Sequence, residues 1–232
     1  DFAELAMYWL YTDCHRLSSC AVTDLDYSTQ IDTNDLGIFV EDWLYDYWSG
    51  EYALSFDGND RVIISNSPAQ SPSTITVECW VSFAQHTGTQ YLVCKGGSAY
   101  PYLGSYYLRK TGTEPNNHSL SFCLMPYSSE YKATATGLSL ETGEWYHVAG
   151  TYDGQDIKLY LNGNLVASNT IWARAVGNNY SINLGRHGIS SSGYLTGQLD
   201  EVRIWKYART EEQLQATMNR VLTGQEYGLV GY

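Results

Sequence analysis

Charge is scarce in this chain, and positive charge is the scarcest. Of 232 residues only 16% are charged, and 13 basic side chains against 25 acidic ones give a formal net charge of −12. Such a surface repels a phosphate backbone and has few cations with which to displace its counterions. Nucleic acid is therefore excluded as the expected partner.

Long apolar runs are also missing. No stretch of 18 or more apolar residues occurs, so no segment is expected to span a bilayer. What is abundant instead is tyrosine, tryptophan and glycine, at 21, 7 and 21 residues against only 3 methionines. Aromatic residues favour strands and glycines favour turns, so this composition predicts many short strands separated by turns.

The segment from Glu144 to Gly163 shows this pattern most clearly. It predicts two adjacent strands, joined at Asp153-Gly154 and closed by a turn at Asn162-Gly163, because these dipeptides adopt positive φ at little cost. Alternate residues from Ile75 to Phe83 are apolar and predict one buried strand face. A capping box at 210–213 predicts a short helix to about Arg220. Other strands are expected within residues 54–64 and at 90–94, 105–109, 119–124, 146–152, 157–161 and 181–184.

Four motifs follow one another along the chain. They are LSFDGNDRV at 54–62, ITVECWV at 75–81, EWYHVAGTYDG at 144–154 and GQLDEVRIW at 197–205. Together they resemble the laminin-G-like, concanavalin A-like jelly roll. The resemblance implies a mainly β, two-sheet antiparallel sandwich, a secreted or cell-surface location, and a module that binds rather than catalyses.

The first 48 residues have a different texture. Residues 1–10 and 35–44 repeat one another and place apolar residues at helical spacing, which predicts two short helices. Between them, oxygen-bearing residues stand at the spacing of an EF-hand calcium loop. The predicted ligands are Asp24, Asp26, Ser28, Gln30, Asp32 and Asp35.

This region resembles a dockerin repeat, cut short at its start. Thr29 stands where that family has glycine, so the alternative is a polar turn that caps the second helix. The expected organisation is a dockerin-like helical unit at 1–48, a jelly roll ending in a short helix at 49–224, and a linker or the start of a further module at 225–232.

A second calcium site is implied by the jelly-roll resemblance. It would join the turn after the first strand to the closing strand, and the matching residues are Asp57, Asn59, Asp60 and Asp200. The alternative is that Asp57 and Asn59 form the turn and Asp200 ends a strand.

The five cysteines leave the disulfides open. Cys14 and Cys20 lie close enough in the sequence to form a bridge. Cys79, Cys94 and Cys123 lie in strand-like runs and are expected to be small core residues, two of which could pair.

Catalytic patterns are not found. The related laminarinase-like hydrolases carry E-x-D-x-x-E on one strand, but Glu78, Glu141 and Glu144 have no partner at that spacing. Asp200 and Glu201 are neighbours and would face opposite sides of a strand. No G-x-S-x-G motif occurs either. The chain is therefore expected not to be an enzyme, a glycoside hydrolase being the less favoured reading.

The expected function is binding, within a larger secreted or cell-surface protein. The partner would be a polysaccharide or another extracellular protein, and the candidate ligand-binding residues are Tyr102, Trp172 and Tyr194, whose rings could stack on sugars. The alternative for each is packing within the fold. A structural role is also open, in which the chain is a subunit of an extracellular assembly or filament, because an unpaired strand at the C-terminus or an edge strand pairs with a neighbouring copy.

Calcium should raise the melting temperature of the chain. An ion that binds only the native state stabilises it by mass action, by about 2.7 kcal/mol at a hundredfold excess over its dissociation constant. Calorimetry of the chain in calcium and in chelator measures the shift. Equal melting temperatures would contradict both predicted sites.

Overall fold

The computed structural model describes residues 53–86, 88–96, 105–113, 117–126, 129–171 and 177–232. By its internal contacts the chain divides into two units, Asp1–Tyr52 and Ala53–Tyr232. The helices and the calcium loop predicted before residue 49 lie outside the described residues, as do Cys14, Cys20, Tyr102 and Trp172. Those predictions stay predictions.

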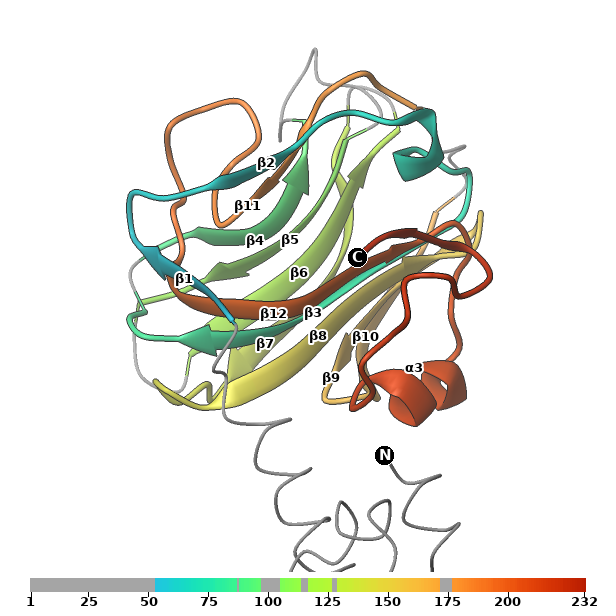
Figure 1. The fold of residues 1–232 in the computed structure, drawn as a ribbon. Helices are drawn as coiled ribbons and strands as arrows, with labels where there is room; N and C mark the ends of the chain where they lie inside the picture. The colour runs from blue at the N-terminus through green and yellow to red at the C-terminus, as the bar shows by residue number, and fades with distance from the viewer. Residues whose placement is uncertain (1–52, 87, 97–104, 114–116, 127–128, 172–176) are drawn as a thin grey trace, which may run out of the picture. The chain divides into compact units, whose positions relative to one another are not determined.

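The unit Ala53–Tyr232 is built of two antiparallel sheets that face each other (Figure 1). Sheet A has the order β1-β12-β3-β8-β9-β10, with β13 also paired to β12, and sheet B has the order β2-β11-β4-β5-β6-β7. The predicted two-sheet sandwich is confirmed. Sheet A comprises β1 (Leu54–Asp57), β3 (Ile75–Phe83), β8 (Trp145–Tyr152), β9 (Asp156–Leu161), β10 (Asn164–Thr170), β12 (Thr196–Trp205) and β13 (Leu229–Gly231). Sheet B comprises β2 (Val62–Ile64), β4 (Gln90–Lys95), β5 (Ser105–Thr111), β6 (His118–Met125), β7 (Tyr131–Leu138) and β11 (Ile182–Leu184).

Two short helices connect these strands. They are the 3-10 helix η3 (Pro68–Gln70) and the α-helix α3 (Glu211–Thr217). The helix predicted to reach about Arg220 therefore ends three residues earlier. Among the described residues, no helix has the length and hydrophobicity needed to cross a bilayer.

The strand pair β8–β9 forms as the Asp-Gly turn predicts. The Asp153 carboxylate accepts hydrogen bonds from the backbone N–H groups of Gln155 and Asp156, at 2.9 and 2.7 Å, and Gly154 takes a φ of +104°. Asn162 and Gly163, both with positive φ, then turn the chain into β10. Asp-Gly and Asn-Gly dipeptides thus set the register of three neighbouring strands.

The core lies between the sheets. On β3 the predicted apolar face is confirmed, since Ile75, Val77, Cys79, Val81 and Phe83 are all at most 2% exposed and belong to the main core cluster. The even-numbered side chains of β3 face the other side of sheet A.

Three cysteines are described, and none is paired. Cys79, Cys94 and Cys123 are free and buried, so the prediction that two of them could pair is wrong. The register explains this for two of them, because Tyr107 of β5 lies opposite both Cys94 of β4 and Cys123 of β6 and so separates them. Burial raises the pKa of both Cys94 and Cys123 to about 12, which leaves them as unreactive thiols.

The C-terminal segment is part of the sandwich. β13 pairs with β12, with Gly231 opposite Ile204 and Leu229 opposite Trp205. The hypothesis of an unpaired C-terminal strand that joins a neighbouring copy is therefore wrong, while assembly through an edge strand stays a prediction. The strand finds its partner within its own sheet.

Replacing Gly150 by alanine should destabilise the sandwich. A Cβ at this position of β8 would lie 2.1 Å from Cγ of Phe122, in the middle of the core. Overpacking of this kind costs about 1–3 kcal/mol of unfolding free energy, measured by urea denaturation. The control is Gly231→Ala, whose new Cβ would meet nothing closer than 3.5 Å and should change stability by no more than about 0.5 kcal/mol. Equal stabilities of the two variants would contradict the described packing.

Candidate functional site

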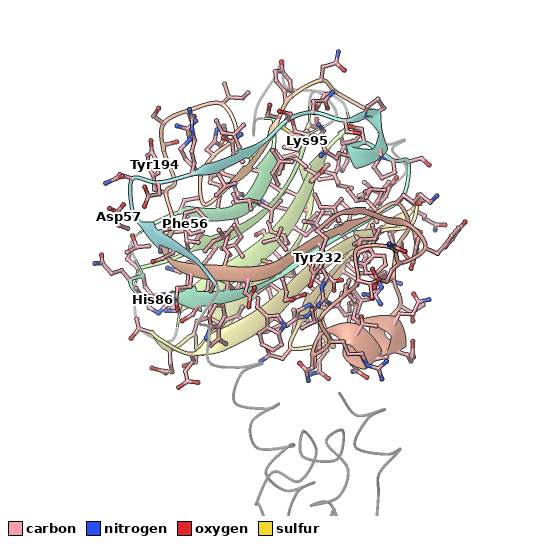
Figure 2. The ribbon with its side chains drawn as sticks, in the orientation of Figure 1. Phe56, Asp57, His86, Lys95, Tyr194 and Tyr232 are labelled. Atoms are coloured by element: carbon pink, nitrogen blue, oxygen red, sulfur yellow. The ribbon has the colours of Figure 1, made fainter. Side chains whose placement is uncertain are left out.

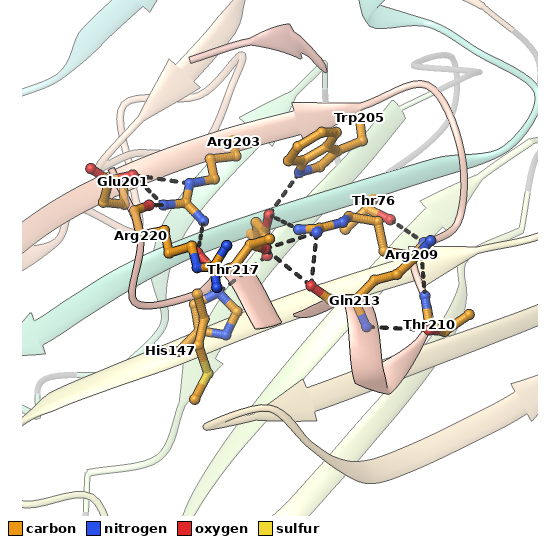
Figure 3. A network of polar contacts seen from close by, with 12 residues as sticks. Thr76, His147, Glu201, Arg203, Trp205, Arg209, Thr210, Gln213, Thr217 and Arg220 are labelled. Carbon is orange, nitrogen blue, oxygen red and sulfur yellow. Dashed lines mark hydrogen bonds and ion pairs between the residues drawn. The ribbon is translucent and has the colours of Figure 1, made fainter. Parts of the chain in front are cut away.

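A buried ion network lies on the outer face of sheet A (Figure 3). Its centre is Glu78, which the alternation of β3 directs away from the core and which is 0% exposed. Its Oε1 accepts hydrogen bonds from Trp205 Nε1 at 2.7 Å and from Arg209 Nη1 at 3.0 Å, and its Oε2 lies 3.2 Å from His147 Nε2. Burial would raise the pKa of Glu78, but the hydrogen bond and charge of His147 and the charges of Arg209 and Arg203 outweigh it and lower that pKa.

The network ties α3 to the sheet. Arg209 Nη2 donates to the carbonyl oxygen of Gln213 and to Thr217 Oγ1, both at 2.8 Å, while Leu214 packs on Ala149 and Tyr160. The helix begins at the predicted capping box, since the Thr210 hydroxyl accepts from the Gln213 N–H. The outer face of sheet A is thereby covered along β8 and β9.

A second arginine fastens the C-terminal segment. Arg203 donates from Nε to Glu201 Oε2 at 3.0 Å and from Nη1 to the carbonyl oxygen of Thr217 at 2.9 Å. The hydroxyl of Tyr232 bonds Glu201 Oε1 at 2.9 Å, and Figure 2 shows Tyr232 over sheet A.

This network is structural in its chemistry. A carboxylate beside an imidazole resembles a catalytic pair, but Glu78 and His147 have side chains that are 0% and 1% exposed. No substrate atom can approach them without displacement of α3.

The turn between β1 and β2 holds three of the predicted calcium ligands. Asp57 Oδ1 accepts from the Asn59 N–H at 3.0 Å, and Asp60 Oδ2 accepts from the Asp57 N–H at 3.2 Å. Asp57 pairs with Thr196 of β12, four residues before Asp200, which corresponds to about 13 Å along a strand. Asp200 instead accepts from the Glu201 N–H at 2.7 Å, so the structure does not bring it to the other three. The described part of the chain contains no group of three His, Cys, Asp or Glu side chains arranged around a metal.

The outer face of sheet B has a different character. Its middle is a cluster of buried residues, Tyr91, Cys94, Tyr107 and Cys123, which share that face of β4, β5 and β6. Charged residues stand beside the cluster: Arg109 Nη2 lies 3.4 Å and Lys132 Nζ 2.9 Å from Glu130 Oε1. The hydroxyl of Tyr107 donates to Glu130, which fixes this carboxylate in place.

A loop after β11, residues 185–195, covers part of this face. Its His187 ring packs edge-on against Tyr91 at 4.9 Å between ring centroids, and its Gly188 N–H donates to Cys94 Sγ at 3.2 Å. Arg186, in the same loop, donates from Nη1 to Ser191 Oγ at 3.5 Å and to Tyr194 Oη at 3.4 Å. We call the polar surface formed by Arg109, Glu130, Lys132, Arg186 and Tyr194 the sheet-B surface.

Of the predicted ligand-binding residues, the structure describes only Tyr194. It lies in this loop, half-buried, and Figure 2 shows it on the same side of the sandwich as Asp57. Sequence reasoning missed Arg109, Glu130, Lys132 and Arg186. The alternation of β5 could have directed Arg109 to the outer face, but the fold of residues 185–195 has no such periodic signal.

The family model described as the concanavalin A-like lectin/glucanases superfamily, of laminin G type, matches residues 56–215. That is more than half of the chain, and the chain belongs to this family.

Individual proteins give narrower similarities. Mouse pappalysin-1 (Mus musculus) is 33% identical over 84 residues, which cover 33% of this chain and 5% of that protein. The chain thus spans only a small part of this curated relative's length.

Two solved structures share the fold over most of the sandwich. A putative carbohydrate binding protein from Bacteroides ovatus is 25% identical, with a TM-score of 0.59 over 76% of this chain and 49% of that chain. Domain 4 of AbnA, an extracellular arabinanase from Geobacillus stearothermophilus, solved in complex with arabinotriose, is 24% identical with a TM-score of 0.56, covering 71% of this chain and 75% of its own. One of these two structures is thus described as a putative carbohydrate binding protein, and the other holds a bound trisaccharide.

Replacing Glu78 by glutamine should destabilise the fold without touching the sheet-B surface. Removal of one partner from a buried ion pair leaves the other charges uncompensated and costs about 3–5 kcal/mol. Urea denaturation at neutral pH measures this loss. Because the native pKa of Glu78 is lowered, its contribution is present above the usual carboxylate pKa of 4.5 and is lost as pH falls through the native value.

The matched control is the exposed Glu144, changed to glutamine. It should alter stability by no more than about 0.5 kcal/mol. A Glu78→Gln variant as stable as the control would contradict the network. So would a difference in stability between wild type and Glu78→Gln that is as large in acid as at neutral pH.

Proposed function

We propose that the chain is a non-catalytic glycan-binding module of a secreted or cell-surface protein, and that the glycan lies on the sheet-B surface. The observation that carries this proposal is the difference between the two faces. The outer face of sheet A is closed by α3 and the Glu78 network, whereas charged side chains on sheet B still reach solvent, with side-chain exposures of 18% for Arg109 and 45% for Lys132. Sugar sites need convergent polar groups held in fixed positions, which buried tyrosines provide here.

The composition of the same face supports binding without catalysis. Glycoside hydrolysis needs a pair of carboxyl groups flanking the bond. The described strands of sheet B contain no Asp or Glu, and Glu130, just before β7, is already engaged by Tyr107, Arg109 and Lys132. A carboxylate held in three such contacts is suited to orient a ligand rather than to transfer a proton.

The family and its neighbours support a sugar as the partner. The chain belongs to a lectin-like family, and two structures of the same fold are described as a putative carbohydrate binding protein and as a complex with arabinotriose. Calcium enters the proposal as a stabiliser bound by residues 24–35. Within the sandwich, the turn carboxylates already have backbone partners.

Soluble polysaccharides should retard the full chain in affinity gels, and titration calorimetry should give the affinity. We expect Arg109→Gln and Lys132→Gln to weaken binding about tenfold, because each removes charge-assisted hydrogen bonds from the surface. Both experiments are run in calcium and in chelator, because the N-terminal unit is present in the full chain.

Lys158→Gln is the matched control. Lys158 lies on β9 in the opposite sheet and pairs in register with Thr151, so its loss should leave affinity unchanged. No retardation by any polysaccharide, with or without calcium, would overturn the proposed function. Binding that is lost in the Lys158 variant but kept in the Arg109 and Lys132 variants would move the site to the other face.

A further inference from the structure

Arg186 is a buried guanidinium without an acidic partner in the described structure. The residue is 6% exposed, and its acceptors are the carbonyl oxygen of His187 at 3.3 Å, Ser191 Oγ and Tyr194 Oη. All three acceptors are neutral. Charges that are taken out of water are normally paired, because their desolvation is costly.

The other buried arginines of the sandwich show what pairing looks like here. Arg203 is 1% exposed and paired with Glu201, and Arg209 is 5% exposed and paired with Glu78. Arg109 on the sheet-B surface has Glu130. Within the described ranges, Arg186 differs from these in having only hydroxyl and carbonyl oxygens around it.

One end of this guanidinium, the Nη2 nitrogen, is available to a ligand. Nη2 of Arg186 makes no hydrogen bond to a described residue, and it is not among the fully enclosed polar atoms that lack a partner, so it reaches solvent. Three serines of the same loop, Ser190, Ser191 and Ser192, are exposed and carry hydroxyl groups. The two N–H groups of Nη2 are therefore left for an oxygen of a carboxylate or a sulfate, the acceptors with which a guanidinium makes its strongest hydrogen bonds.

A second cation acts on the same place. The pKa of Tyr194 is lowered, first by its hydrogen bond with Arg186, then by Ser191, and also by the charges of Arg186 and Arg61. Arg61 is exposed at the end of the β1–β2 turn. The turn carboxylates Asp57 and Asp60 hydrogen-bond within the turn, and neither forms an ion pair with Arg186.

We propose that Arg186, with the hydroxyls of Tyr194 and Ser191 and with Arg61 nearby, binds the anionic group of an acidic sugar. This inference rests on the proposed function and narrows it to glycans that carry a carboxylate or a sulfate ester. The chain has a net charge of −12, so long-range attraction cannot recruit such a glycan. Recognition must come from local contacts, since screening at physiological salt limits exposed charges to about 8 Å.

Matched probes test the charge requirement on the full chain. Trigalacturonate is compared with its methyl ester, and sulfated dextran oligosaccharides are compared with unsulfated ones, by titration calorimetry. At least one acidic probe should bind about tenfold or more tightly than its neutral counterpart, because the charge-assisted contact with Arg186 is lost in the latter. The two pairs distinguish a carboxylate from a sulfate.

Variants test the residue. Arg186→Gln should remove the preference for the acidic probe, and Arg186→Lys should restore only part of it, because lysine keeps the charge but not the fork. Arg61 lies outside the loop 185–195, and Arg61→Gln should weaken the binding of the acidic probe without changing that of the neutral one. Arg220→Gln is the matched control: the described contact of Arg220 is through its carbonyl oxygen, to Arg203, and its exposed side chain should be dispensable.

The outcomes separate this inference from the proposed function. If neutral probes bind and acidic ones bind no better, the glycan-binding function stands and the anion site is wrong. The same holds if acidic probes bind equally well to wild type, Arg186→Gln and Arg61→Gln. If no probe binds, the anion site is wrong, and the affinity gels with polysaccharides decide whether the glycan-binding function stands. Thermal melts identify any Arg186 variant whose loop has unfolded. In that case the effect of Arg61→Gln on the acidic probe decides whether the anion site exists.

Discussion

A carboxylate with no access to water must be compensated from within the protein, and Glu78 imposes that requirement on the middle of sheet A. Its compensating groups come from three separate parts of the chain: His147 of β8, Trp205 of β12 and Arg209 just before α3. Arg209 in turn holds the helix through Gln213 and Thr217. The placement of α3 thus depends on one acidic side chain of β3, a strand that lies more than a hundred residues earlier in the chain.

The outer faces of the two sheets therefore differ in how their charged side chains are used. On sheet A, each buried arginine has a carboxylate, and the polar groups are consumed in holding the fold together. On sheet B, tyrosines and cysteines fill the space beneath the charged groups, so that Arg109, Lys132 and Arg186 are positioned without being enclosed by a helix. A lectin-like sandwich thereby obtains a rigid support on one side and a polar surface on the other.

Most strands were predictable because their periodicity is physical. β3, β8 and β9 alternate between core and surface, and the Asp-Gly and Asn-Gly turns set their register. β7 and β10 were missed because they lie at the sheet edges and are rich in Thr, Ser, Asn and Lys. Edge strands bury little on either face, so the alternation that identifies a strand is weak there.

The site was less predictable than the fold. Tyr194 could be selected as an aromatic residue in a loop. The lack of an acidic partner for Arg186 could not be predicted, because it depends on which residues the fold brings around the guanidinium and not on the local sequence. The closing strand gives a second example. A bulge between Asp200 and Arg203, with Glu201 at a φ of +50°, interrupts the alternation from which Asp200 and Glu201 were expected to face opposite sides.

The pairing of β12 has a consequence for how the sandwich folds. β12 pairs with β1 at one end and β13 at the other, so the first and the last strand of this unit both close on the same partner. Contacts between such distant residues form slowly, because the long intervening loop must be closed before they stabilise anything. On the ribosome, β1 has no partner until most of the unit has been made, and the far end of β12 stays open until Leu229–Gly231 emerges. During synthesis these strand edges are therefore the parts of the sandwich most exposed to aggregation and to chaperones.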